Sequence, residues 1–394
     1  MTLASFIAWF SGAFVFGIVI MLGCVGETLT EKSGNLNLGV PGIMYLGGIS
    51  SLAAVFLAQL KVREMIAEAA AVFVAAGNRA QEWVPEGGLL EFLTQPVSSA
   101  ITVKGAEASY RVFFDFNGWV GVAIAILSAL VGAALGGLIY AFLTVTLRAN
   151  QNVTGLTLTI FGSGVANFFG GSLNKLAGGV GQISVKTTSD AFRTSIPWIS
   201  TAFGRVSELL FNYGFFAYIA IIIALLTHFY LSKTRYGLNL RAVGENPATA
   251  DAAGINVTKY KYLATCIGAA ITGLGGLYFV MDYIKGTWAN DGSIEALGWL
   301  AVALVIFTKW KPINAIWGAF VFGMCYWIFL YMPQGVSEFL ADLFNVQKIA
   351  HLQSLYKMIP YLVTIIVLII TSLHKKKENQ PPQSLGLSYF REDR

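Results

Sequence analysis

The chain has 394 residues, of which 56% are hydrophobic and only 12% are charged, and its formal net charge is +5. Soluble domains carry about 25% charged residues. Such a sparse set of charges cannot cover the surface of a water-soluble protein of this length. The composition therefore excludes an ordinary soluble protein and gives no reason to expect nucleic-acid binding.

Long uncharged runs predict the membrane-spanning helices, because a helix needs about 20 apolar residues to cross the hydrocarbon core. No Lys or Arg precedes the first run, so we expect a retained helix and not a cleaved secretory signal. We expect an all-α polytopic membrane domain over residues 1–373, with about 8–10 transmembrane helices. The long runs are 4–26, 39–60, 118–147, 153–173, 213–231, 262–281 and 312–332, and the shorter candidates are 296–308 and 358–373.

Basic residues between the runs predict the orientation, because short loops rich in Lys and Arg stay in the cytoplasm. The richest loop spans residues 233–261. When the spans are counted alternately, Lys309, Lys311 and the cluster 375–377 fall on the same side as this loop. That agreement places all of these segments in the cytoplasm.

Two polar segments complete the predicted domain organisation. Residues 61–117 fall outside the cytoplasm as an insertion, in which 66–76 is expected to form an amphipathic helix on the outer membrane surface. The basic tail 374–394, with Pro381 and Pro382, is expected to be disordered in the cytoplasm.

The loop 233–261 contains the signals of a short helix. Asn246 suits a helix cap, Pro247 suits the first helical position, and Ala248 begins a run of strong helix formers. Gly254 is expected to end the helix.

The predicted helix has few large side chains. Glu245 and Asp251 are expected on its exposed side, and small residues such as Ala252 allow close approach by another protein. Docking to a partner is one interpretation of this pattern. An ordinary loop helix is the other, and composition alone favours it.

Two segments resemble a known family. The first reads Arg-Ala-Val-Gly-Glu-Asn-Pro over 241–247 and Ala-Ala-Gly-Ile-Asn-Val over 252–257. The second reads Glu-Lys-Ser-Gly-Asn-Leu-Asn-Leu-Gly-Val-Pro-Gly-Ile-Met over 31–44. They resemble permeases of ATP-binding cassette (ABC) importers of the branched-chain amino acid and simple sugar type, whose cytoplasmic coupling loop looks like the first segment. The second segment looks most like a permease of nucleoside importers, although Pro41 stands where relatives commonly have glutamate.

The resemblance implies a type II-like ABC importer transmembrane domain in the bacterial inner (cytoplasmic) membrane. It also implies partners for this chain: an ABC ATPase subunit, a second, homologous permease, an extracytoplasmic substrate-binding lipoprotein and membrane lipids. The favoured cargo is a nucleoside, and a simple sugar or a riboflavin-like vitamin stays open. The residues that would couple to the ATPase are Gly244, Glu245, Asn246, Pro247, Ala248, Asp251, Ala252 and Gly254.

The chain has no phosphate-binding loop of the Gly-x-x-x-x-Gly-Lys-[Ser/Thr] type. We therefore expect the partner ATPase to use ATP and Mg²⁺, while this chain binds no cofactor and is not itself an enzyme. The three cysteines and three histidines show no metal-ligand spacing, and no catalytic constellation is evident. We expect neither a metal site nor catalytic residues.

Neutral polar residues are candidates for the transport path. Thr159, Ser163 and Asn167 recur at intervals of four and share one helix face. They line a path for a neutral solute, or they form hydrogen bonds between helices, and both interpretations fit equally. Asn35 and Asn37 lie among glycines where the chain enters the membrane, and we expect a broken helix end there, with either packing or gating as its role.

Two further function classes compete with an importer permease. An ion-coupled secondary transporter is the main alternative, but such carriers show internal repeats and intramembrane ionisable residues. Neither feature is evident in the sequence, and an intramembrane enzyme lacks a catalytic set. The glycine pair 132 and 136 and the glycines 268, 273, 275 and 276 predict close helix packing.

Overall fold

The computed structural model describes residues 3–85, 87–105, 108–176, 183–195, 212–288 and 292–331, a few positions between 358 and 369, and 380–390. Six of its helices are long and apolar enough to cross a membrane. They are α1 (Leu3–Glu31), α2 (Val40–Ala75), α4 (Gly118–Ala141) with the π-helical turn η2 (Phe142–Thr146), α5 (Gln151–Leu176), α9 (Phe215–Lys233), and α12 (Val257–Tyr278) with the π-helical turn η3 (Phe279–Tyr283).

Two more apolar helices, α13 (Ser293–Phe307) and α14 (Pro312–Tyr331), pack beside α1. The structure therefore confirms the all-α polytopic membrane body. The candidate run 358–373 lies mostly outside the described residues, so the total of about 8–10 spans stays a prediction.

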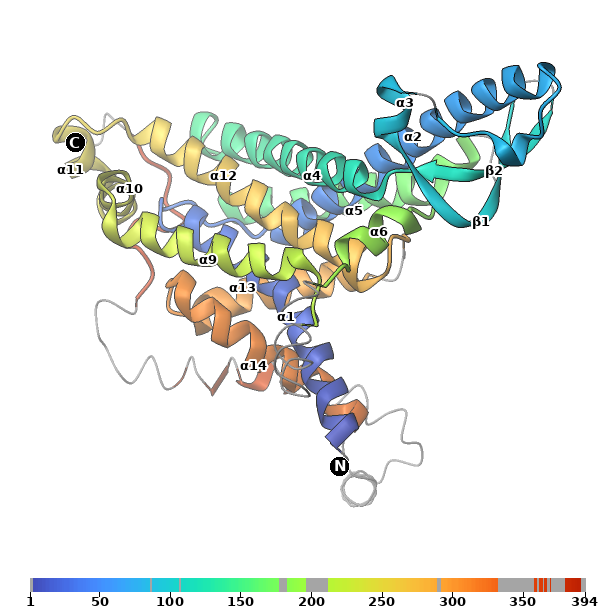
Figure 1. The fold of residues 1–394 in the computed structure, drawn as a ribbon. Helices are drawn as coiled ribbons and strands as arrows, with labels where there is room; N and C mark the ends of the chain where they lie inside the picture. Colours follow the sequence, from blue (N-terminus) through green and yellow to red (C-terminus); the bar gives the residue numbers. More distant parts are fainter. Residues whose placement is uncertain are drawn as a thin grey trace.

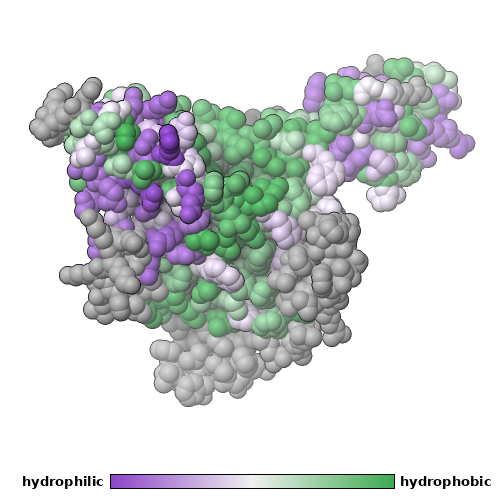
Figure 2. Space-filling model, turned by 60° about the vertical axis from the view of Figure 1, so that its left-hand side comes forward, coloured by the Kyte–Doolittle hydropathy of each residue, from purple (hydrophilic) through white to green (hydrophobic). Residues whose placement is uncertain are grey.

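The short polar elements lie at two opposite ends of the long helices (Figure 1). The short helices α10 (Arg235–Glu245) and α11 (Pro247–Ala252) lie at one end, which we call the α11 end. The hairpin of β1 (Thr94–Lys104) and β2 (Ser109–Phe116) lies at the opposite end, which we call the hairpin end. Figure 2 shows hydrophobic residues over the middle of the visible face and hydrophilic residues toward both ends.

The basic loops do share one end, as the alternate counting predicted. Lys32, Arg241 and Lys311 line one surface pocket at the α11 end. Residues 375–377 lie outside the described residues.

Glycines allow the central helices to approach closely, as predicted. A methyl group at Gly42 of α2 would overlap the backbone of Leu158 in α5. A methyl group at Gly273 of α12 would overlap the side chain of Ala133 in α4. The predicted glycines that meet a neighbouring helix in this way are Gly132, Gly136, Gly268, Gly273, Gly275 and Gly276.

The insertion differs from the expected surface helix. Residues 66–75 continue α2, whose 36 residues are about 54 Å long at about 1.5 Å per residue. This exceeds a hydrocarbon core of about 30 Å, and α2 projects at the hairpin end (Figure 1). Ile66, Ala67 and Ala70 are buried in the cluster that includes Val103 and Val112 of the hairpin. The buried face of this stretch therefore covers the hairpin, while Val72 on its other side is exposed.

Short elements complete the hairpin end and its surroundings. The turn η1 (Ala80–Glu82) and the helix α3 (Gly88–Leu93) connect α2 to β1, and α6 (Lys186–Phe192) packs against α4. The strands are antiparallel, with an irregular register between Pro96 and Ile101.

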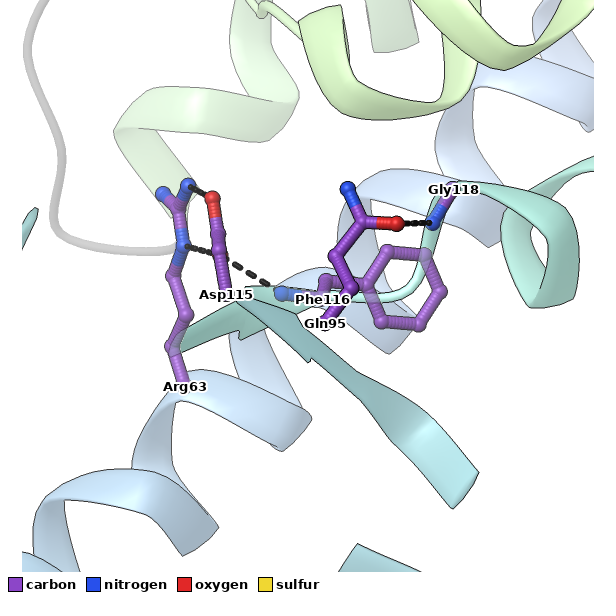
Figure 3. A network of polar contacts seen from close by, with 5 residues as sticks. All are labelled: Arg63, Gln95, Asp115, Phe116 and Gly118. Atoms are coloured by element: carbon purple, nitrogen blue, oxygen red, sulfur yellow. Dashed lines mark hydrogen bonds and ion pairs between the residues drawn. The ribbon is translucent and has the colours of Figure 1, made fainter. Parts of the chain in front are cut away.

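An ion pair fastens the hairpin to α2 (Figure 3). Arg63 Nε lies 2.9 Å from Asp115 Oδ1, and Arg63 Nη2 lies 2.7 Å from Asp115 Oδ2. Asp115 Oδ1 also accepts a hydrogen bond from the Phe116 N–H at 2.8 Å, and Asp115 is only 3% exposed. A bidentate pair with a buried carboxylate has a defined geometry and is stronger than a neutral hydrogen bond.

Asp115→Asn should loosen the hairpin by about 2 kcal/mol, because it removes charge-assisted bonds from a buried group. We expect amide hydrogen exchange of residues 94–116 to accelerate about thirtyfold, while the central helices keep their protection. Glu64→Gln is the matched control, since its pair with Lys61 is exposed and contributes little. Equal exchange in both variants would contradict this role of the pair.

Candidate functional site

Local capping signals build the two helices at the α11 end. The Thr234 hydroxyl accepts a hydrogen bond from the Gly237 N–H at 3.0 Å and begins α10. Asn246 Oδ1 accepts from the Thr249 N–H at 3.0 Å and begins α11. The predicted short helix is confirmed, with Pro247 in its first turn and Gly254 beyond its end at a φ of +82°. The sequence analysis did not identify α10 as a separate helix.

The two faces of α11 differ sharply. Val243, Ala250 and Val257 form a buried cluster that holds α10, α11 and α12 together. The outward residues are small or polar, and nothing lies within 4 Å of where a Cβ atom would project from Gly254. The exposed set is Glu245, Asn246, Thr249, Ala252, Ala253 and Gly254, while Pro247, Ala248 and Asp251 are half-buried.

Gly244 differs from the other predicted coupling residues, because it is buried inside the chain. A side chain at Gly244 would overlap the carbonyl oxygen of Lys32, just after the end of α1. Gly34, in the same connection, has a φ of +86° that glycine adopts without strain. Gly244 therefore joins α10 to the connection between α1 and α2, and only its neighbours form the outward surface.

The C-terminal segment 380–390 is not disordered, contrary to expectation. The Ser384 N–H and hydroxyl both donate to the Gly244 carbonyl, at 3.1 and 2.6 Å. The Gly386 N–H donates to the Gly34 carbonyl at 3.2 Å, and the Tyr389 hydroxyl lies 3.0 Å from Asp251 Oδ2. These bonds to folded elements fix a polar segment that has no core of its own. Asp251 consequently faces the tail and not only solvent.

The connection between α1 and α2 holds the predicted asparagines in packed positions. Asn35 Nδ2 donates to Thr265 Oγ1 in α12 at 3.0 Å, and Asn35 is 1% exposed. Asn37 is 2% exposed, and its Oδ1 accepts from the Gly39 N–H at 2.9 Å. Both side chains are thus packed inside the described part of the chain, and their place in the substrate path stays a prediction.

A pair of buried acidic residues was missed in the sequence. Glu27 and Glu31, in the last two turns of α1, are 1% and 4% exposed. Glu27 Oε1 accepts from the Asn37 N–H at 3.0 Å, and Glu31 accepts from the indole N–H of Trp310. Both glutamates lie within the first of the six helices of membrane length, where no acidic pair was predicted. Both carboxyl groups fasten chain connections at the α11 end.

Of the predicted row Thr159, Ser163 and Asn167 on α5, only Thr159 contacts the α1–α2 connection. Thr159 is 4% exposed, and its hydroxyl donates to the Leu38 carbonyl at 3.2 Å. Ser163 bonds to its own helix, at the Ile160 carbonyl, and Asn167 is exposed. The row therefore runs from the α1–α2 connection to an uncovered face of α5. That face also exposes Val153, Leu156, Ile160, Phe161 and Phe168.

The charges at this end are mixed. Burial lowers the pKa of Lys32, while the nearby Glu245 carboxylate raises it and Arg241 lowers it. Glu245 thus offsets part of the cost of placing several basic groups together.

Comparison with known proteins identifies the architecture. The family described as branched-chain amino acid transport system / permease component matches residues 8–368. The chain belongs to this family. No solved structure matches it.

The permease is similar to three curated proteins. It is 31% identical over 360 residues to the nucleoside ABC transporter permease protein NupC of Lactococcus lactis subsp. cremoris, covering 90% of this chain and 89% of the relative. It is 30% identical over 276 residues to the guanosine ABC transporter permease protein NupQ of Bacillus subtilis, covering 68% and 80%. It is 28% identical over 307 residues to the putative glucose ABC transporter permease protein TsgC13 of Haloferax volcanii, covering 78% and 72%.

Ser384→Ala tests the docking of the permease's C-terminal segment. The variant loses one buried hydrogen bond to Gly244, worth about 1 kcal/mol. We expect amide exchange of residues 384–389 to accelerate about fivefold. Ser388→Ala is the control, because Ser388 makes no hydrogen bond within the described part of the chain. Unchanged exchange in Ser384→Ala would show that the segment is held by other contacts.

Proposed function

We propose that this permease moves nucleosides into the cell as the membrane subunit of an ATP-driven importer. The supporting observation is its similarity, over nine-tenths of its length, to a permease named for nucleoside transport. A path lined by neutral polar groups suits an uncharged polar solute. Simple sugars are the second candidate, favoured by the relative named as a putative glucose transporter permease.

The proposed contact with a separate ABC ATPase is the outward surface of α11. Its small exposed residues, from Ala252 to Gly254, leave room for a groove of another protein to close around the helix. Gly244 lies behind this surface against the α1–α2 connection, so a push on α11 would reach the membrane helices directly. ATP and Mg²⁺ would be used on the ATPase, with no cofactor on this chain.

A second, homologous permease would cover the uncovered face of α5. Asn167 lies on that face, and open space surrounds Gly164 and Gly171. Apolar residues of a membrane protein need lipid or protein against them, whereas a polar Asn167 is better accommodated by protein or water. The path would then lie between the two permeases.

The remaining assignments follow the orientation of the chain. The α11 end would face the cytoplasm of a bacterial inner membrane, and the hairpin end would face outward. The projecting α2 and hairpin would meet the extracytoplasmic substrate-binding lipoprotein.

Coupling is tested by Pro247→Arg and Ala252→Trp. A large side chain on the outward surface would block a close-fitting partner, and we expect ATP-dependent nucleoside uptake to fall about tenfold or more, equivalent to about 1.4 kcal/mol of lost contact. Co-purification of the ATPase should fall with it. Ile222→Trp, at an exposed position of α9 to which no partner is assigned, is the control. Normal uptake and assembly in the α11 variants would refute this docking surface.

The α5 row is tested by a pair of variants with opposite expectations. Thr159→Val removes the bond to Leu38 and should lower stability by about 1 kcal/mol. Asn167→Leu removes no described internal bond and should reduce uptake while leaving the melting temperature unchanged. Equal losses of uptake and stability in both variants would favour a purely structural row.

An ion-coupled secondary transporter is distinguished by energy source. Vesicles that contain only this chain should not accumulate labelled nucleoside under an ion gradient. Addition of the ATPase, the second permease, the lipoprotein and ATP should start uptake. Accumulation by the chain alone would overturn the proposal.

A further inference from the structure

A cavity at the α11 end adjoins the outward surface of α11, with which it shares Asp251 and Gly254. Its volume is about 700 Å³. It is enclosed by the α4–α5 connection, the first turns of α12 and the docked C-terminal segment, which contributes Tyr389. These three segments lie far apart in the sequence, and folding brings them together around the cavity.

Basic groups dominate the charged lining of this cavity. Arg148, Lys259 and Lys261 face it, against Asp251 as the one acidic lining residue in the described part of the chain. The Asp251 carboxylate already accepts a hydrogen bond from Tyr389, and the Arg148 guanidinium lies 4.4 Å from the centre of the Phe390 ring. Arg148 and Lys259 are exposed. The cavity therefore carries excess positive charge.

Lys261 is the decisive residue, because it is 3% exposed and lines the cavity. Within the described residues no hydrogen bond or ion pair reaches its amino group. An isolated buried ammonium group is costly, and buried charges are usually paired. An anion in the cavity would supply the missing partner.

The start of α12 adds a second attraction for an anion. Asn256 Oδ1 caps the helix by accepting from the Lys259 N–H at 2.9 Å. The Val257 and Thr258 amides, at the cavity wall, lie in the turn where a helix dipole favours negative charge. The Thr258 hydroxyl, on the same turn, offers a further donor.

We propose that this cavity binds a phosphate group, held by Lys261, Arg148, Lys259 and the first turn of α12. A phosphate has several acceptor oxygens and can pair with donors that converge from separate elements. The same chemistry belongs to an anionic phospholipid headgroup and to a soluble phosphate. The site does not depend on which solute the permease carries.

The test uses the full-length chain, purified and delipidated in mild detergent. Its melting temperature is measured with inorganic phosphate, with dioleoylphosphatidylglycerol, and with dioleoylphosphatidylcholine as the zwitterionic control, at constant ionic strength. We expect phosphate or phosphatidylglycerol to raise the melting temperature by about 3–5 °C near saturation. A rise with phosphate alone identifies a soluble ligand, and a rise with phosphatidylglycerol alone identifies a lipid headgroup.

Variants assign the effect to the cavity. Lys261→Met keeps the length of the side chain and should abolish the rise, and the exposed Arg148→Gln should reduce it. Lys233→Met is the matched control, because Lys233 is an exposed lysine at the end of α9 that does not line the cavity. The proposal is overturned if neither ligand stabilises the wild-type chain. It is also overturned if Lys261→Met, or Arg148→Gln should Lys261→Met fail to fold, retains the full rise.

Discussion

The connection between α1 and α2 depends on satisfying the polar groups of its irregular backbone. Ser33, Asn35 and Asn37 are buried, and side chains from neighbouring helices satisfy several of these backbone groups. The Leu36 N–H donates to Gln151 Oε1 at 2.7 Å, the Asn37 N–H to Glu27 at 3.0 Å, and the Leu38 carbonyl accepts from Thr159 at 3.2 Å. The connection thereby binds α1 and α5 into one unit.

The same connection is continuous with the α11 end. Gly244 lies against the Lys32 carbonyl, and Ser384 and Gly386 bond to Gly244 and Gly34. Because Gly34 and Gly244 have no side chains, the two backbones are in direct contact, with no side chains packed between them. A displacement of α11 would consequently move the end of α1 together with the C-terminal segment.

Local and solvent-driven features were predictable from the sequence. Uncharged runs of membrane length predict membrane helices because a helix surrounded by lipid must be apolar along its whole length. The Asn-Pro and glycine signals predict α11 because capping involves only residues close together in the sequence. Features that depend on distant partners were not predictable. Glu31 lies just beyond the first uncharged run and contacts a residue 279 positions away. Residues 380–390 carry a polar composition typical of disorder, and they are fixed by bonds to Gly34, Gly244 and Asp251 together with apolar contacts of Leu385 and Tyr389.

The two ends of the molecule differ in how their contacts would respond to force. At the α11 end, α10, the C-terminal segment and the α1–α2 connection meet through backbone groups, which shift little relative to one another. At the hairpin end, the extension of α2 and the strands are joined through apolar side chains and one ion pair, between Arg63 and Asp115. The row on α5 starts at the rigid end, at Thr159, and leads to the uncovered face at Asn167. The Thr159 bond to Leu38 thus links α5 to the α1–α2 connection, whereas the hairpin is held by the extension of α2.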